Sequence, residues 1–403
     1  ATPKFIMDKV EQLAAYMPPM VYCRMGNIVS PTGAEAEGWL ISVGGTPREM
    51  LSRSPEFTYR RLLHAAKIAE KLGAQIMGLG AFTKVVGDAG ITVARRSRLP
   101  ITTGNSYSAS GALWAAADAM RRMGLAKIDP KTGRVAGKTM VVGAAGSIGS
   151  VSARLLAMSF DEVYLAGLTL DKLEELKASI LKDTPDAKVF TTIDYDNLLA
   201  EMDMIVTSTS GAGKSVLDIT RVKPGCVITD VARPLDLPAS EVAKRPDVLV
   251  IESGEIELPT KVRGMKNIGL PDNVIYACLA ETIVLALEGR FEVFTIGRNT
   301  EWEKVKEIYK LGLKHGMKLA AISGVKGVYT DQDIAKVVAL ARKARLTWKD
   351  PGGTRPAGKA AKPKAVRAPR AAVKAAPAAK APASKTAAGA KAPAVKQAPA
   401  AKR

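Results

Sequence analysis

The chain of 403 residues has a net charge of +20, 47% hydrophobic residues and three cysteines, and these numbers exclude several classes of protein. Its length and hydrophobic content fit a globular protein of two or three domains. Cys23, Cys226 and Cys278 are far apart and only two histidines are present, so neither a disulfide framework nor a zinc site is expected. We therefore expect metal-free chemistry in a reducing compartment.

Membrane insertion is not expected either. The first residues, ATPKFIMDKVEQLAAYM, are interrupted by charges, and no run of about 18 uncharged apolar residues occurs in the chain. The sequence therefore predicts a cytoplasmic protein without a transmembrane segment.

The first predicted elements form an N-terminal α/β substrate domain, which we place at residues 1–125. A helix is expected over 55–71, followed by a strand and a glycine-rich turn in AQIMGLGAFTK (74–84). The segment 102–124, which begins TTGNSYS, predicts a long helix with Asn105 or Ser106 as its N-cap.

Residues 126–268 alternate between short β-branched runs and helical periodicity. Helices are expected over 147–160 and 169–181. Strands are expected in KTMVVG, EVYLAG, AKVFTT, DMIVTST, CVITDVA and DVLVIE. Strands that alternate with helices indicate a doubly wound parallel sheet, so the predicted fold class is α/β with a Rossmann dinucleotide-binding domain.

The turn VVGAAGSIGS (141–150) lies where the first of these strands meets its helix. Glycines at such a turn permit a tight bend, close approach of a pyrophosphate and close helix packing, while the N–H groups at the helix start attract phosphate. The spacing here is GxxGxxG rather than the commoner GxGxxG. The predicted cofactor-binding residues are Gly143, Gly146, Ser147, Ile148 and Gly149.

The choice of cofactor depends on the end of the second strand, where an acidic residue would bind the ribose hydroxyls of NAD. Gly167, Leu168 and Thr169 occupy this position, and Lys172 follows one turn later. We therefore predict NADPH, with Thr169 and Lys172 contacting its extra phosphate. NADH remains an alternative, and Lys172 also fits a solvated helix lysine.

The C-terminal helical part, residues 269–348, is expected to pack near the active site. Its three predicted helices cover 272–287, 301–315 and 331–345. Residues 351–403 then contain 13 lysines or arginines and no acid, which leaves +7 of the net charge on the residues before them. This Lys/Ala/Pro-rich tail cannot bury enough surface to offset chain entropy, so it is predicted to be disordered.

Six blocks, taken in order, resemble segments of the cyanobacterial long-chain acyl-[acyl-carrier-protein] reductases: MGLGAFT (77–83), TTGNSYSA (102–109), GAAGSIGS (143–150), YACLAE (276–281), IGRN (296–299) and KHG (314–316). The resemblance implies that NADPH reduces a fatty acyl thioester, carried by acyl carrier protein or CoA, to an aldehyde. It also implies an acyl intermediate on Cys278. Two features depart from the family: Leu168 replaces an arginine, and the basic tail has no counterpart.

Cys278 has two interpretations. Its position favours a core residue, because it borders an apolar helical stripe formed by Ile275, Leu279, Ile283 and Ala286. Chemistry favours catalysis, because transfer of the acyl group to an enzyme thiolate splits the reduction into two steps and frees the carrier. Together with the resemblance, this predicts Cys278 as the nucleophile.

The turn TTGNSYS supplies the other predicted catalytic groups. Thr103 and Asn105 are expected to stabilise the oxyanion that forms during reduction, although a capped helix is the alternative interpretation. Glu281 is expected to have a structural or orienting role. His315 is expected to end a helix, and a role near the acyl site is the alternative.

Two other functions remain open. One is an NAD(P)-dependent dehydrogenase of a small hydroxy or keto acid, of the shikimate-dehydrogenase type, with Cys278 as a packing residue. The other is a non-enzymatic, nucleotide-binding protein that contacts DNA through residues 351–403, since an unpaired cationic tail binds polyanions. The tail would also raise the encounter rate with an acidic carrier protein, or serve only as a solubilising linker. A homo-oligomer is compatible with the sequence.

Overall fold

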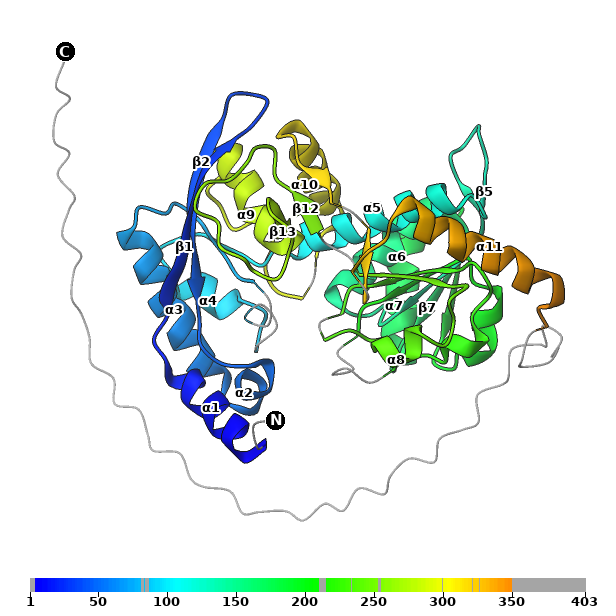
Figure 1. Cartoon of the computed structure of the whole chain (residues 1–403), viewed down its shortest axis with the longest axis horizontal. Coiled ribbons are helices and arrows are strands. Elements are labelled where there is room, and N and C mark those ends of the chain that lie inside the picture. The colour runs from blue at the N-terminus through cyan, green and yellow to red at the C-terminus, as the bar shows by residue number, and fades with distance from the viewer. Residues whose placement is uncertain are drawn as a thin grey trace, which may run out of the picture. The chain divides into compact units, whose positions relative to one another are not determined.

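The computed structural model describes residues 4–80, 83, 87–209, 215–232, 234–252, 255–298, 300–320, 322–325 and 327–349. The largest sheet in this part of the chain has nine strands (Figure 1). In spatial order they are β16 (Gly327–Val328), β15 (Ser323–Gly324), β11 (Leu249–Glu252), β10 (Val227–Asp230), β9 (Met204–Thr207), β6 (Val135–Val142), β7 (Phe160–Ala166) and β8 (Lys188–Thr192), with β5 (Lys127–Ile128) paired to β6.

The strands β6 to β11 are parallel, and their order β8-β7-β6-β9-β10-β11 is that of a Rossmann sheet, with the change of direction between β6 and β9. The predicted fold class is therefore confirmed. Both faces are covered, as parallel strands require. Residues of α5 (Asn105–Met123), α6 (Ser147–Ser159), α7 (Leu170–Asp183) and α11 (Asp331–Thr347) pack on one face. Residues of η2 (Asp196–Glu201), η3 (Ile219–Arg221) and α8 (Ala239–Val242) pack on the other.

The N-terminal elements form a second α/β region. The helix predicted over 55–71 is confirmed as α3 (Pro55–Lys71), with its proline in the first turn. The other elements are α1 (Lys4–Tyr16), the antiparallel pair β1 (Met20–Val29) and β2 (Glu35–Ser42), α2 (Pro47–Ser52), α4 (Ile91–Arg96), and the parallel pair β3 (Met77–Gly78) and β4 (Ile101–Thr102).

The chain after the Rossmann strands returns to the N-terminal elements. A small antiparallel sheet joins β12 (Glu255–Glu257) to β13 (Val274–Tyr276) and to β14 (Lys318–Leu319). The helices α9 (Ala277–Leu287) and α10 (Trp302–Lys314) share a hydrophobic core with β1 and the start of α5. By contrast, β15, β16 and α11 join the Rossmann sheet. The domain boundaries at residues 125, 268 and 348 stay predictions.

Two predicted helix starts are wrong. The helix expected from residue 272 begins only at Ala277, because Val274–Tyr276 pairs with β12 as a strand. The N-cap of α5 is Gly104, and Asn105 is the first helical residue. Both errors concern segments whose conformation depends on distant parts of the chain.

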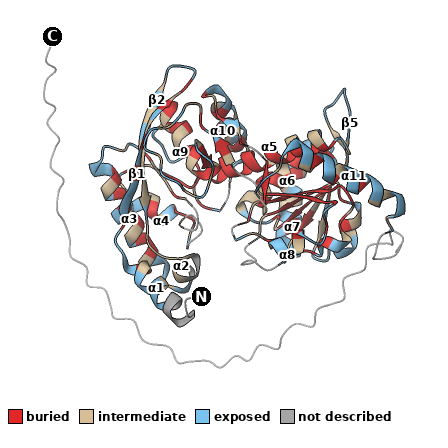
Figure 2. Cartoon of the chain, in the orientation of Figure 1, coloured by how far each residue is buried: buried red, intermediate tan, exposed pale blue. Residues whose placement is uncertain are grey.

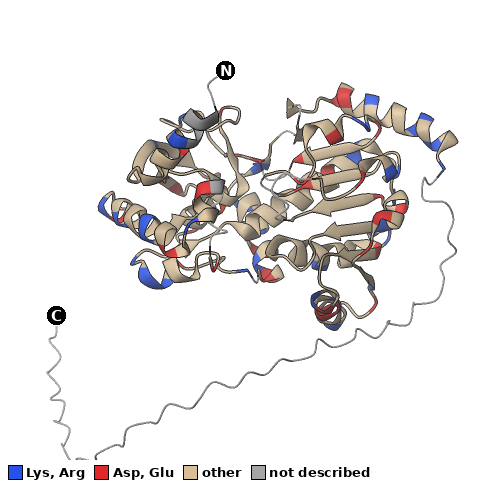
Figure 3. Cartoon of the chain, turned by 90° about the horizontal axis from the view of Figure 1, so that it is seen from below, with Lys and Arg blue, Asp and Glu red and all other residues tan. Residues whose placement is uncertain are grey.

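Helix α5 connects the two cores of the molecule. Tyr107 packs in the core shared with α9, whereas Met120 and Met123 pack against the Rossmann sheet. Figure 2 accordingly shows α5 buried along most of its length. Charged residues concentrate on outer helices such as α11 (Figure 3), which has acids in its first turn and Arg345 in its last. Among the described helices, none combines the length and apolar content needed to span a bilayer.

Candidate active site

A large cleft brings together Cys278 and the glycine turn. Its wall includes residues of the N-terminal elements, of α9 and of the loops that follow the Rossmann strands. The cleft volume is about 2810 Å³. Because small-molecule sites commonly occupy about 300–1,000 Å³, this cleft has room for a dinucleotide and a second ligand.

Cys278 is the second residue of α9 and lines the cleft, with 8% of its surface exposed. The start of a helix has unpaired backbone N–H groups and favours an anion. The other two cysteines have different surroundings: Cys23 belongs to β1 and packs in the core shared with α9, and Cys226 is fully buried beside the Rossmann sheet. Burial raises the pKa of the Cys226 thiol. Of the three, only Cys278 lines the cleft.

The turn before α5 packs directly against the first turn of α9. Gly104 has a φ of +71°, and a Cβ at this position would lie 2.1 Å from the carbonyl oxygen of Cys278. Glycine is therefore required both by the backbone conformation and by the close approach. Without a side chain, however, Gly104 cannot cap α5 itself.

Glu281 supplies the missing cap from the neighbouring helix. Its carboxylate is fully buried and accepts hydrogen bonds from the backbone N–H of Tyr107, at 2.9 Å, and from the hydroxyl of Thr102. A carboxylate at a helix N-terminus satisfies unpaired N–H groups and interacts favourably with the helix dipole. This geometry is that of the expected orienting residue, because Glu281 fastens the cysteine-bearing helix to α5.

Thr103 and Asn105, the two predicted oxyanion donors, have different surroundings. Thr103 is fully buried, does not line the cleft, and donates both its N–H (2.8 Å) and its hydroxyl (3.3 Å) to the carbonyl of Thr295. Asn105 lines the cleft, and its side-chain amide makes no hydrogen bond to any described residue. Asn105 is therefore the one placed to contact a ligand, whereas Thr103 holds the turn in place.

The glycine turn has the geometry of a dinucleotide-binding loop. Gly143 has a φ of +83°, which permits the tight bend after β6. A Cβ on Gly149 would lie 2.3 Å from the carbonyl oxygen of Gly143, so this glycine allows close packing of α6. Gly146 is the N-cap of α6 and lines the cleft together with Ser147 and Ile148. The helix start thus offers N–H groups to a phosphate at the switch point of the sheet.

The residues predicted to select the cofactor lie along the next helix. Lys172 is exposed, lines the cleft and forms no ion pair within the described part of the chain. Thr169 is the exposed N-cap of α7 and does not line the cleft. Leu168, beside it, is 100% exposed. Lys172 is therefore the better placed of the two predicted phosphate contacts.

Two buried acids, Asp230 and Asp236, are not among the predicted site residues but support the loops after β9 and β10. Asp236 accepts hydrogen bonds from the backbone N–H (2.8 Å) and the hydroxyl (2.5 Å) of Thr209, which lines the cleft. Asp230 accepts from the N–H groups of Ala232 (3.1 Å) and Leu237 (2.9 Å). Burial, with the charge of Asp236 adding to it, raises the pKa of Asp230 to about 6.

A sequence signal for Asp230 was present. It is the last residue of a buried strand, and the carboxyl ends of parallel strands form the ligand-binding edge of a doubly wound sheet.

The apolar stripe beside Cys278 faces the cleft. Ile275, Leu279, Ile283 and Ala286 all belong to its lining. Other apolar lining residues come from β2, α3 and the segment of β3, and include Leu40, Ile41, Leu62, Ala65, Met77 and Leu79. The apolar stripe, which by itself favours a core role for Cys278, is therefore part of an apolar wall of the cleft beside Cys278.

The segment 295–300, here called the strap, joins the cysteine side of the cleft to the glycine turn. Besides its bonds to Thr103, Thr295 donates its hydroxyl to Ser106 at 2.8 Å. Gly297 donates its N–H to the carbonyl of Ala89 at 3.0 Å. At the other end, the hydroxyls of Thr300 and Ser147 lie 2.5 Å apart. Asn299 lies outside the described residues.

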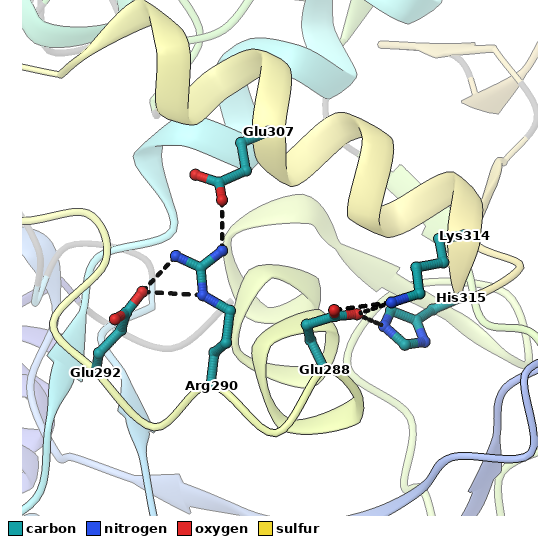
Figure 4. A network of polar contacts seen from close by, with 6 residues as sticks. All are labelled: Glu288, Arg290, Glu292, Glu307, Lys314 and His315. Carbon is teal, nitrogen blue, oxygen red and sulfur yellow. Dashed lines mark hydrogen bonds and ion pairs between the residues drawn. The ribbon is translucent and has the colours of Figure 1, made fainter.

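His315 lies away from the cleft. As predicted, it ends a helix, where it forms the C-cap of α10. Its Nε2 lies 2.7 Å from Glu288 (Figure 4), and its Nδ1 lies 3.0 Å from Ser30. This network joins α10 to the end of α9 and to the β1–β2 hairpin. Within the described residues, no group of three or more His, Cys, Asp or Glu side chains is arranged to hold a metal ion.

No protein-family model matches the chain, but it is similar in sequence to several curated proteins, two of which follow. Aminotransferase PigE of Serratia sp. is 32% identical over 297 residues, which cover 73% of this chain and 34% of PigE. The long-chain acyl-[acyl-carrier-protein] reductase of Synechococcus elongatus is 26% identical over 320 residues, which cover 76% of this chain and 89% of the reductase. The chain thus spans about a third of PigE and most of the reductase, to which it is distantly related.

Similarity to solved structures is remote. L-tryptophan dehydrogenase from Nostoc punctiforme has 14% sequence identity and a TM-score of 0.33, with 78% of each chain covered. Quinate dehydrogenase from Corynebacterium glutamicum, in complex with NAD, has 13% identity and a TM-score of 0.31, covering 62% of this chain and 81% of the dehydrogenase.

Proposed function

We propose that this protein is an NADPH-dependent oxidoreductase that reduces a long-chain acyl thioester to an aldehyde through an acyl group on Cys278. One observation carries the proposal: Cys278 and the N-terminus of α6 line the same cleft, beside an apolar wall long enough to include residues of α9, α3 and β2. The distant relation to a long-chain acyl-[acyl-carrier-protein] reductase supports it.

The first step transfers the acyl group to the enzyme. The Cys278 thiolate attacks the thioester carbonyl carbon, a new C–S bond forms, and the carrier leaves as a thiolate that takes up a proton. Cys278 lies in the first turn of α9, where backbone N–H groups have no partner within the helix. Glu281 and Gly104 hold this helix turn in place, and the apolar wall binds the acyl chain.

The second step releases the aldehyde. A bound reduced nicotinamide supplies the hydride for the acyl carbon. Asn105, which lines the cleft, would donate a hydrogen bond to the oxygen that becomes negative. The resulting hemithioacetal on Cys278 collapses, so the C–S bond breaks, the C=O bond re-forms and the thiolate is regenerated. Overall, a thioester, NADPH and a proton give an aldehyde, a thiol and NADP⁺.

The chain's own residues fit a dinucleotide. A Cβ on Gly143 or Gly149 would lie within 3 Å of a backbone carbonyl oxygen, so the turn needs glycine at both positions. Gly146, the N-cap of α6, has no side chain that would cover the start of this helix, where a diphosphate would bind. Lys172 would contact the extra phosphate of NADPH; NADH is the alternative. Thr103 would not contact the substrate. Its hydrogen bonds to Thr295 would instead hold the turn that positions Asn105, the proposed oxyanion donor.

Intact-protein mass spectrometry tests the covalent step. Incubation with an acyl-CoA in the absence of nicotinamide should add one acyl group to the protein, and peptide mapping should place it on Cys278. Cys278→Ala should show no added mass and produce no aldehyde with NADPH. Cys23→Ala is the matched control, because Cys23 is also largely buried but does not line the cleft, and it should be acylated normally.

Other outcomes would assign the protein differently. Reduction of a small keto acid that survives Cys278→Ala would identify a dehydrogenase of the shikimate-dehydrogenase type. Salt-sensitive DNA binding lost on truncation after Asp350, without turnover of any thioester, would favour a DNA-associated protein. Residues 351–403 lie outside the described residues, so contact of this tail with DNA or an acidic carrier is a proposal, as are a cytoplasmic location and a homo-oligomer.

A further inference from the structure

We propose that Arg298 binds a phosphate group inside the cleft. This inference rests on the proposed function, because it concerns the ligands of the same cleft. Arg298 belongs to the strap and lines the cleft with an exposed side chain.

The charge of Arg298 is not matched by a carboxylate. Its guanidinium donates one hydrogen bond, to the carbonyl of Gly87 at 2.9 Å, and forms no ion pair with the described residues. The neighbouring acid, Asp88, instead accepts hydrogen bonds from the hydroxyls of Thr92 (2.6 Å) and Tyr59 (3.1 Å).

Arg290, eight residues earlier in the chain, is an arginine whose charge is balanced by carboxylates. It is bonded to Glu292 and, at 2.5 Å, to Glu307, so two carboxylates surround its charge (Figure 4). Unlike Arg298, it does not line the cleft. An arginine that lines a cleft without a carboxylate retains N–H donors in the planar arrangement that matches a phosphate.

The strap places Arg298 between two ligand-binding features. Gly297, just before it, is bonded to Ala89, and Thr300, two residues later, is bonded to Ser147 at the start of α6. Arg298 is therefore anchored next to the helix start where a diphosphate is expected. The other end of the strap is bonded to the turn that packs on Cys278. The strap that carries Arg298 is thus bonded both to the cofactor helix and to the turn that packs on Cys278.

Two ligands of the proposed reaction carry such a phosphate. One is the diphosphate of the nicotinamide cofactor, and the other is the phosphate of the pantetheine arm of CoA or of a carrier protein. The shared chemistry is a phosphate ester or anhydride held by a guanidinium.

The test uses the full chain and three variants. Arg298→Gln removes the charge and keeps a donor for Gly87, Arg298→Lys keeps the charge, and Arg290→Gln is the control. NADPH dissociation constants are measured by fluorescence titration, after circular dichroism confirms folding. In a second arm, KM is compared for an acyl-CoA and for the same acyl group on N-acetylcysteamine, which lacks phosphate.

Arg298→Gln should weaken a phosphate ligand about tenfold, the loss expected for one charge-assisted hydrogen bond, and Arg298→Lys should weaken it less. A higher NADPH dissociation constant assigns a phosphate of the cofactor. A higher KM for acyl-CoA alone assigns a phosphate of the CoA carrier. If Arg298→Gln changes neither value, or if Arg290→Gln changes them equally, the proposal is overturned. A wild type that binds NADPH but reduces no thioester would refute the proposed function while the titration still decides the role of Arg298.

Discussion

The two sides of the cleft are built in different ways. The cofactor side comes from one continuous stretch, in which β6, the glycine turn and α6 follow each other within residues 135–159. The cysteine side is assembled from segments around residues 78, 104, 278 and 295, which are far apart in sequence. A local motif is therefore enough to form the cofactor side, whereas the cysteine side depends on tertiary packing. Variants should accordingly affect cofactor binding and cysteine acylation separately.

Gly104→Ala should have the largest effect, because it breaks the cysteine side. The new Cβ would lie 2.1 Å from the Cys278 carbonyl oxygen at a positive φ, so we expect a loss of about 3 kcal/mol or more in the free energy of unfolding. Acylation of Cys278 should fail, while NADPH binding is retained by the folded fraction. Urea unfolding and intact mass measure both effects.

Gly124→Ala is the matched control for this substitution. Gly124 has a φ of +60° but no atom within 4 Å of its added Cβ. It should lose only about 1 kcal/mol, through backbone strain. Equal unfolding midpoints for the two variants would show that the contact with Cys278 is not close in solution.

An acid on the cofactor side gives a pH-dependent effect. The pKa of Asp230 is about 6 in the folded protein, above its ordinary value of 3.8. Its contribution to stability is therefore present below about pH 4 and lost as the pH rises through 6, which costs about 3 kcal/mol at most. In urea unfolding between pH 4 and 7, the wild type should lose stability relative to Asp230→Asn. Parallel stability curves would contradict the raised pKa.

Gly149→Ala should affect the cofactor side alone. Its Cβ would lie 2.3 Å from the carbonyl oxygen of Gly143, so α6 must move away from the turn. We expect the NADPH dissociation constant to rise about tenfold, because a lost phosphate contact at this helix start is of that size. Acylation without nicotinamide should be unchanged. Gly26→Ala, where an added Cβ meets nothing within 4 Å, should leave both measurements at the wild-type value.

The smallest effect is expected at the selectivity position. Lys172→Ala should reduce the preference for NADPH over NADH about two- to fivefold, as for an exposed charge pair. Leu168→Arg should raise the preference, and because Leu168 is 100% exposed, it should not affect folding. Titrations with both cofactors measure the ratio. If neither variant changes it, the extra phosphate is bound elsewhere.

The two helix predictions that bracket the cleft show the limit of sequence patterns. Pro55–Lys71 was predicted with its actual bounds, because a proline at its start and an amphipathic pattern act locally. In the run from residue 272 to 287, apolar residues fit a strand and a helix equally well. In the structure, Val274–Tyr276 pairs with β12 as a strand, so the helix begins at Ala277. Cys278 therefore lies in the first turn of the helix, not in its middle as predicted.

The sequence alone determined the Rossmann sheet and its glycine turn, because strand alternation, helix periodicity and glycine conformation depend on neighbouring residues. It also singled out Cys278, through chemistry and family resemblance. Only the tertiary structure decided what surrounds that cysteine: the cap from Glu281, the separation of Thr103 from Asn105, and the strap that carries Arg298. These features rest on contacts between residues up to 211 positions apart, which no local pattern encodes.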